Sequence, residues 1–194
     1  FKSEAGKQGY QAMSPGDDPN KLLPVLDPAT LEGCLRAMND YQDVYNRLMR
    51  VPFNFAKIDQ LQVFSEKPIS TFLASVAASE SVLQASLTSA TGAPCIGVFQ
   101  GSIADAGSYP MNGVDVAPSR CALNVLGIIA PQEQFDAVSA ILTQSLASFR
   151  FTEAYIQEGI QATDLLGENA AERSRQNMAM MDEIVRNFTD YIRS

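Results

Sequence analysis

The chain has 194 residues, of which 46% are hydrophobic and 19% are charged, and its net charge is −8. This length and balance fit one globular domain with a hydrophobic core, and they exclude disordered, collagen-like and coiled-coil classes. An acidic chain without a basic stripe is also unsuited to nucleic acids, because phosphate backbones repel it.

The first 27 residues are rich in Gly, Pro and small polar residues, which predicts an extended lead-in before a single α+β domain over residues 28–194. Because the chain begins at Phe1 rather than Met, we expect that an upstream segment was removed, and a secretory leader is one candidate. The sequence has no apolar run long enough to cross a bilayer, so we expect no transmembrane segment in this chain.

A long N-terminal helix is predicted over residues 28–50. Asp27 is a typical N-cap residue, and Pro28 occupies the favoured first helical position. Apolar side chains then recur every three or four residues from Leu31 to Met49, which is the period of one helical face. Pro52 predicts the end of this helix.

The middle of the chain predicts an antiparallel sheet. Residues 53–64 and 83–87 have strand-like patterns, with a short helix expected from Pro68 to Val76 between them. Turn-forming residues at 88–94 lead into a return strand at 95–100. A long loop is expected at 101–118, with Asn112-Gly113 as a turn. The strand at 121–129 is almost entirely apolar, which favours burial on both of its faces.

Two helices are predicted in the last third of the chain. The first spans residues 131 to 149, and its apolar face consists of Phe135, Val138, Ile141 or Leu142, Leu146 and Phe149. The final helix, over residues 169–193, carries an apolar stripe formed by Met181, Ile184, Val185, Phe188, Tyr191 and Ile192. This stripe must be covered, either by its own domain or by a second copy or a protein partner, so it is the candidate partner surface.

The residue types that are missing limit the chemistry. Without histidine, the chain lacks Ser-His-Asp triads, Cys-His pairs and HExxH zinc sites, and it contains no P-loop or Rossmann glycine motif. No catalytic residue, cofactor site or metal site is therefore predicted. A carboxylate enzyme stays open as an alternative, because Glu153, Glu158, Asp164 and Glu168 lie close in sequence.

The three cysteines, Cys34, Cys95 and Cys121, are an odd number without CxxC spacing. One alternative is a disulfide between Cys95 and Cys121, which the predicted strands place near each other, and another is a free nucleophilic thiol. Free cysteines most often behave as small buried hydrophobic residues, which is the interpretation we favour.

One segment carries a family resemblance. Residues 135–151, FDAVSAILTQSLASFRF, form a predicted helix that follows an apolar strand. This pattern resembles the closing helix of PsbP-like α/β/α sandwich domains, which occur in bacterial envelope lipoproteins and accessory proteins. The resemblance implies an antiparallel sheet flanked by helices and a non-catalytic role outside the cytoplasm, as in a bacterial secreted protein or lipoprotein. It carries no functional residue over to this chain.

The leading hypothesis is therefore a non-catalytic, extracytoplasmic binding or assembly module with an α+β fold. The alternatives are a small enzyme that uses paired carboxylates or a Cys thiolate, and a structural homo-oligomer subunit. A carboxylate enzyme requires acids that converge in a cleft, whereas a binding module requires an apolar patch or groove without them.

Overall fold

The computed structural model describes residues 1–4, 6–7, 19–49, 52–105, 109–111, 114–116, 119–148, 179, 182–183 and 185–192. The chain forms two compact units, Phe1–Phe135 and Asp136–Ser194. The predicted α+β class is confirmed, with an antiparallel sheet, an N-terminal helix and C-terminal helices. The lead-in over residues 1–27 and the single domain over residues 28–194 stay predictions.

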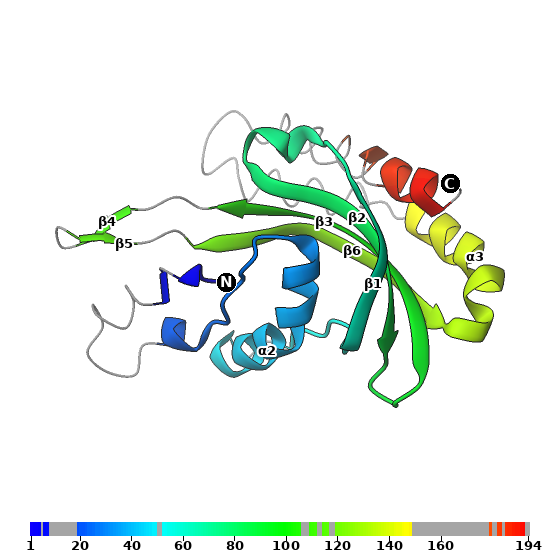
Figure 1. Ribbon diagram of the computed structural model, residues 1–194, viewed down its shortest axis with the longest axis horizontal. Helices are drawn as coiled ribbons and strands as arrows, with labels where there is room; N and C mark the ends of the chain where they lie inside the picture. The colour runs from blue at the N-terminus through cyan, green and yellow to red at the C-terminus, as the bar shows by residue number, and fades with distance from the viewer. Residues whose placement is uncertain are drawn as a thin grey trace, which may run out of the picture. The chain divides into compact units, whose positions relative to one another are not determined.

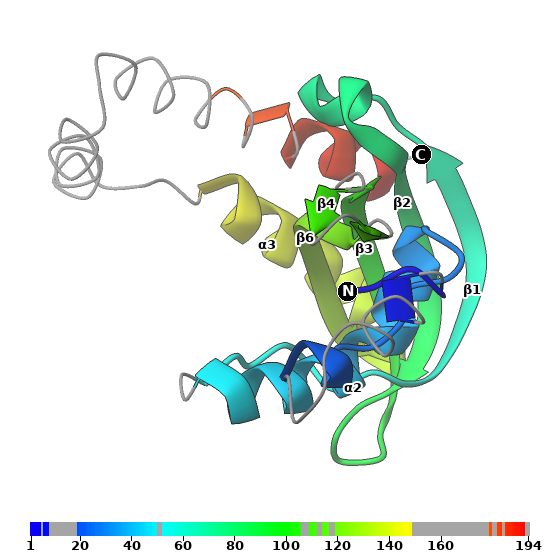
Figure 2. The same ribbon diagram turned by 90° about the vertical axis from the view of Figure 1, so that its left-hand side faces the viewer.

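The first unit contains a four-stranded antiparallel sheet in the order β1-β2-β3-β6 (Figure 1). The strands are β1 (Asp59–Pro68), β2 (Ala77–Thr88), β3 (Pro94–Asp105) and β6 (Arg120–Pro131). Strands of this length twist strongly, and the sheet is visibly curved, with β1 along one edge (Figure 2). Two short 3-10 helices, η1 (Pro19–Leu22) and η2 (Phe72–Ser75), lie outside the sheet.

Helix α2 (Leu31–Met49) packs on one face of this sheet. Its N-terminal half belongs to a core cluster of buried side chains, which are Leu31, Leu35, Ile58, Leu61, Leu83, Ala85, Leu87, Cys95 and Phe99. The helix starts three residues later than predicted, because Thr30 rather than Asp27 caps it. The Gly33 amide donates to Thr30 Oγ1 at 3.1 Å.

Phe99 lies at the centre of this core and is fully buried. Glycines flank its ring on β3 and β6, and a Cβ atom at Gly97 or Gly127 would overlap the ring. The close approach of the ring to both backbones therefore requires glycine at these two positions.

The structure confirms the predicted β2–β3 hairpin, in which Thr88 pairs with Pro94. The loop predicted at 101–118 is wrong, because β3 continues to Asp105 and a second hairpin joins β4 (Tyr109–Met111) to β5 (Val114–Val116). The Asn112-Gly113 dipeptide between these two strands lies outside the described residues.

The predicted burial of residues 121–129 on both faces is also wrong. Within β6 only Ile128 and Ala130 are buried, whereas Cys121 and Gly127 are exposed. The physical reason is that β6 is an edge strand, with β3 as its partner among the described strands, and the layers that bury β3 cover β6 less completely.

The second unit contains helix α3 (Phe135–Ser148), which the 3-10 helix η3 (Gln132–Gln134) precedes. Leu142 is partly buried and Ile141 is 66% exposed, so Leu142 occupies the apolar face of α3. Residues 179, 182–183 and 185–192 are helical, in agreement with the predicted C-terminal helix. Among the residues that the structure describes, no helix is long and apolar enough to span a membrane.

Candidate functional site

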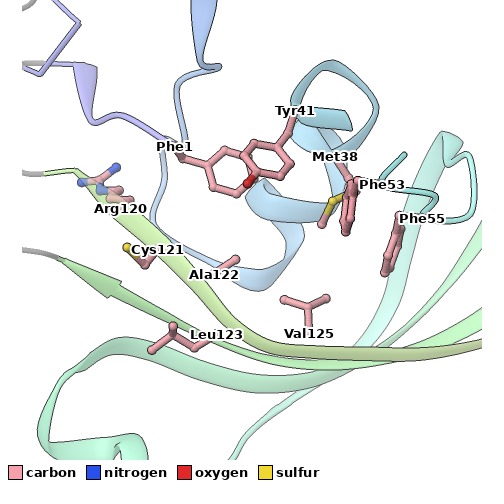
Figure 3. Close-up of a pocket in the computed structure, with 10 residues that line it drawn as sticks. All are labelled: Phe1, Met38, Tyr41, Phe53, Phe55, Arg120, Cys121, Ala122, Leu123 and Val125. Carbon is pink, nitrogen blue, oxygen red and sulfur yellow. The ribbon is translucent and has the colours of Figure 1, made fainter. Parts of the chain in front are cut away.

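A pocket of about 470 Å³ lies in the first unit, next to the C-terminal half of α2 (Figure 3). The residues that line it are Phe1, Met38, Tyr41, Phe53, Phe55, Arg120, Cys121, Ala122, Leu123 and Val125. Figure 3 shows the aromatic side chains along one side, β6 along the other, and Arg120 with Cys121 at one end. The volume falls within the usual range of small-molecule sites, and aromatic and aliphatic side chains dominate the lining.

Four aromatic rings that line the pocket form a continuous cluster with the neighbouring Tyr45, and we call this cluster the ring wall: Phe1, Tyr41, Tyr45, Phe53 and Phe55. The Phe1 and Tyr41 rings stack with centroids 4.7 Å apart. Tyr41 meets Phe53 edge to face at 5.9 Å, and Phe53 stacks on Phe55 at 6.5 Å. Tyr45 contacts both Tyr41 and Phe53, at 5.8 Å and 5.6 Å. Rings in offset-stacked and edge-to-face pairs attract each other by more than the burial of their apolar surface accounts for.

Amide side chains on α2 hold the segment that carries two of these rings. Asn46 Nδ2 donates to the Phe53 carbonyl at 3.1 Å, and the Phe53 amide donates to Asn46 Oδ1 at 2.5 Å. Asn39 makes the same pair of hydrogen bonds with Ile58. Its Nδ2 donates to the Ile58 carbonyl at 2.7 Å, and the Ile58 amide donates to its Oδ1 at 3.1 Å. These side chains take the place of a neighbouring strand and satisfy backbone groups that the sheet does not reach.

A third amide, Gln42, completes this set of tethers by accepting from the Phe55 amide at 2.5 Å. The three tethers explain why β1 begins only at Asp59, instead of within the strand predicted over residues 53–64. They also fix Phe53 and Phe55 in a segment outside β1, where both rings line the pocket and pack against buried core residues. Asn39, Gln42 and Asn46 are spaced at three and four residues, so they share one stripe of the helix.

Phe1 reaches the ring wall through backbone hydrogen bonds. The Lys2 amide donates to the Pro24 carbonyl at 3.1 Å, and the Leu26 amide donates to the Lys2 carbonyl at 2.9 Å. The Arg120 amide donates to the Phe1 carbonyl at 3.1 Å, which ties the same segment to the start of β6. These bonds place the Phe1 ring against Tyr41.

The floor of the pocket is an irregular stretch of β6. In a regular strand alternate residues face opposite sides, yet consecutive residues from Arg120 to Leu123 line this pocket, together with Val125. The pairing of β6 with β3 shifts between Gln100 and Ser102, and Asn124 adopts a left-handed φ of 52°. A bulge of this kind bends the strand and redirects its side chains.

Arg120 is the charged residue at one end of the pocket. Its Nε donates to Asp105 Oδ1 at 3.0 Å, and its Nη1 donates to Asp27 Oδ1 at 3.3 Å. Nη1 also donates to the Leu26 carbonyl. The Arg120 side chain is only 18% exposed, so its positive charge is held by two carboxylates and a carbonyl at the pocket end.

Burial controls the protonation of two groups beside the pocket. It raises the pKa of Tyr41, and the nearby Tyr45, Cys121 and Cys34 act in the same direction. Burial also raises the pKa of Cys34 to about 12, against a smaller opposing effect of the N-terminal ammonium group. Both side chains are therefore neutral at neutral pH.

The structure contradicts the alternative of a disulfide between Cys95 and Cys121, since all three cysteines are free. The favoured interpretation of small buried thiols holds for Cys34 and Cys95, whereas Cys121 is exposed. The two residues do lie on neighbouring strands, but Cys95 pairs with Pro131 and Cys121 pairs with Ala104. Ala104 lies nine steps along the extended strand from Cys95, which corresponds to about 30 Å. A disulfide requires Cα atoms within about 7 Å.

The other predicted sites are only partly described. Phe188 is fully buried, and Val185, Tyr191 and Ile192 are partly buried, whereas Met181 and Ile184 lie outside the described residues. The candidate partner surface therefore stays a prediction. The carboxylates of residues 153–168 also lie outside the described part of the chain. Within that part, no group of three or more His, Cys, Asp or Glu residues is arranged to hold a metal ion.

The sequence contained two signals for this pocket that its periodicity did not reveal. The first is the row of amides on α2, which are too polar for a helix face that only packs against a sheet. The second is Arg120, the single basic residue between positions 68 and 130.

Compared with known proteins, the chain matches no family, no curated protein and no solved structure.

Proposed function

We propose that the protein is a non-catalytic binding module, and that the pocket beside the ring wall holds a small, largely apolar ligand. The observation that carries this proposal is the lining itself. It combines aromatic and aliphatic side chains with one Arg, and none of the described residues that form it carries a carboxylate. Sites with this chemistry are typical of small-molecule binding.

Contacts within the protein hold the walls of the pocket in place. Phe53 and Phe55 are both partly exposed, although each ring contacts other rings. Covering such surface stabilises a complex by roughly 25 cal/mol per Å² of apolar area removed from water. Because the amide tethers fix the segment that carries these rings, little ordering is required when a ligand enters.

The protonation of the lining favours binding over catalysis. A general acid or base works best when its pKa lies near the working pH. Burial raises the pKa of Tyr41 away from neutral pH, and Arg120 is ion-paired with two carboxylates. Cys34 is also a poor candidate for a nucleophilic thiolate, because its pKa of about 12 keeps the thiol protonated.

The place of action is a separate part of the proposal. The resemblance of residues 135–151 to PsbP-like domains supports a location outside the cytoplasm. Fractionation of cells that express the natural gene tests this, and recovery in the cytoplasmic fraction would contradict it.

Binding is tested with the neutral fluorescent probe N-phenylnaphthylamine, whose emission rises in apolar surroundings. We expect a saturable rise with the native protein. Ala122→Trp, which fills the pocket from its floor, should weaken binding at least about tenfold, whereas Val76→Trp at an exposed position should not. Thermal melts of both variants check that they are folded. No saturable binding, or equal binding by the two variants, would overturn the proposal.

A further inference from the structure

We infer that the ligand of this pocket is uncharged and aromatic, and that the pocket discriminates against charged analogues of the same shape. The inference rests on the proposed binding function and adds the chemical class of the ligand. Two features of the site carry it, namely the ring wall and the state of Arg120.

The ring wall favours an aromatic guest. Its ring pairs already combine stacked and edge-to-face arrangements, from 4.7 Å between Phe1 and Tyr41 to 6.5 Å between Phe53 and Phe55. A flat ring in the pocket can repeat these arrangements with the ring surfaces that are still exposed. The opposite wall consists of aliphatic side chains from β6, such as Ala122 and Val125. These side chains have no polar atoms, so the second face of a planar ligand needs no hydrogen-bonding groups to pack on them.

The state of Arg120 disfavours an anion. Arg120 has the one charged side chain among the described residues that line the pocket, but Asp27 and Asp105 both pair with it. The guanidinium donors that could bind an anion are therefore already occupied by carboxylates. An anionic ligand would have to leave water and compete with these carboxylates for the same donors, in a chain whose net charge is −8.

A cation gains no partner in the pocket either. Aromatic rings attract cations through their faces, which makes a quaternary ammonium group the strongest competitor for this assignment. However, the guanidinium of Arg120 lies at the end of the pocket, and none of the described lining residues is an acid. A cation would have to leave water, and the two carboxylates at this end of the pocket are already paired with Arg120, so the neutral ligand is favoured over both charged classes.

The test compares three probes that share a naphthalene ring: neutral N-phenylnaphthylamine, anilinonaphthalene sulfonate as its anionic counterpart, and a naphthyl trimethylammonium salt. Affinities are measured by calorimetry, because the emission of the three probes differs. We expect the neutral probe to bind at least about tenfold more tightly than either charged probe, in the native protein but not in Ala122→Trp.

A matched pair of variants isolates the contribution of Arg120. Asp105→Asn removes one carboxylate from the guanidinium, so binding of the anionic probe should improve several-fold relative to the neutral one. Asp43→Asn changes the net charge equally at an exposed position of α2 and should leave this ratio unchanged. Equal responses of the two variants would contradict the role given to Arg120.

The remaining outcomes separate this inference from the function on which it rests. If a charged probe binds in the pocket as tightly as the neutral one, the ligand class is wrong while the binding function survives. If Ala122→Trp weakens the binding of none of the three probes, the binding function itself is wrong.

Discussion

The two halves of α2 lie on the same sheet, but one half closes a buried core and the other borders an open pocket. Around Leu31 and Leu35 the helix closes a core in which every member is at most 7% exposed. Beyond the buried Met38, around Tyr41, it forms an open pocket lined by partly exposed rings. The difference comes from what lies opposite the helix. In the core, side chains of β2 and β3 interdigitate with it, whereas at the pocket a tethered segment holds its rings beside the sheet.

This comparison teaches that stability and binding are divided along one helix. The core half contributes buried aliphatic area and the tightly enclosed Phe99 ring. The pocket half gives up part of that burial and retains aromatic surface for a partner molecule. Substitutions in the two halves should therefore separate the free energy of unfolding from ligand affinity.

The largest expected effect belongs to the core half. Phe99→Ala should lower the free energy of unfolding by about 3–5 kcal/mol, because it removes a fully buried ring and leaves a cavity between two glycines. Urea denaturation measures this loss. The control is Phe64→Ala, since Phe64 is 55% exposed and its removal should change stability by no more than about 0.5 kcal/mol. Similar losses for both variants would mean that Phe99 is not a central core residue.

An intermediate effect is expected for the tethers. Asn46→Leu leaves the amide and the carbonyl of Phe53 without their partner, which should cost about 1–3 kcal/mol of stability. The same variant should weaken binding of N-phenylnaphthylamine, because the Phe53 ring loses its fixed position. Asp43→Leu, at an exposed position of the same helix, serves as the control. A stable Asn46→Leu protein with native affinity would show that the tethers do not position the ring wall.

A pH-dependent effect, small at each single step of pH, is expected for the Cys34 thiol on α2. Burial raises the pKa of Cys34 from 9.0 to about 12, so folding favours the protonated thiol. The corresponding stability is present below pH 9 and is lost as the pH rises toward 12. Each pH unit in this window should cost up to about 1.4 kcal/mol from this group.

Urea denaturation at pH 8, 9.5 and 10.5 measures this slope. Cys34→Ala removes the thiol and should show a shallower decline than the native protein, while the raised pKa of Tyr41 leaves part of the slope in both. Identical slopes for the two proteins would mean that the Cys34 thiol ionises alike in the folded and unfolded chains.

The core half of the molecule was more accessible to sequence reasoning than the pocket half. Local patterns were sufficient for α2 and for the β2–β3 hairpin, because apolar period and turn residues are short-range signals. The cap at Thr30 was missed, since Asp27 offered an equally suitable residue type.

The pocket was missed because its parts are distant in sequence. Phe1, Tyr41, Phe53 and Val125 come from four separate segments, and no periodicity links them. The apolar sequence of β6 indicated a buried central strand, whereas its edge position depends on which strands pair, which is a non-local property. Its bulge at Asn124 also changes which side chains face α2.

The most direct test of the central claim is a titration of the ¹⁵N-labelled protein with N-phenylnaphthylamine, followed by amide chemical shifts. The account predicts saturable shifts at Tyr41, at residues 53–55 and at residues 120–125, with the amides around Phe99 unchanged. Shifts that are confined to other parts of the chain, or that never saturate, would contradict the assignment of this pocket as the binding site.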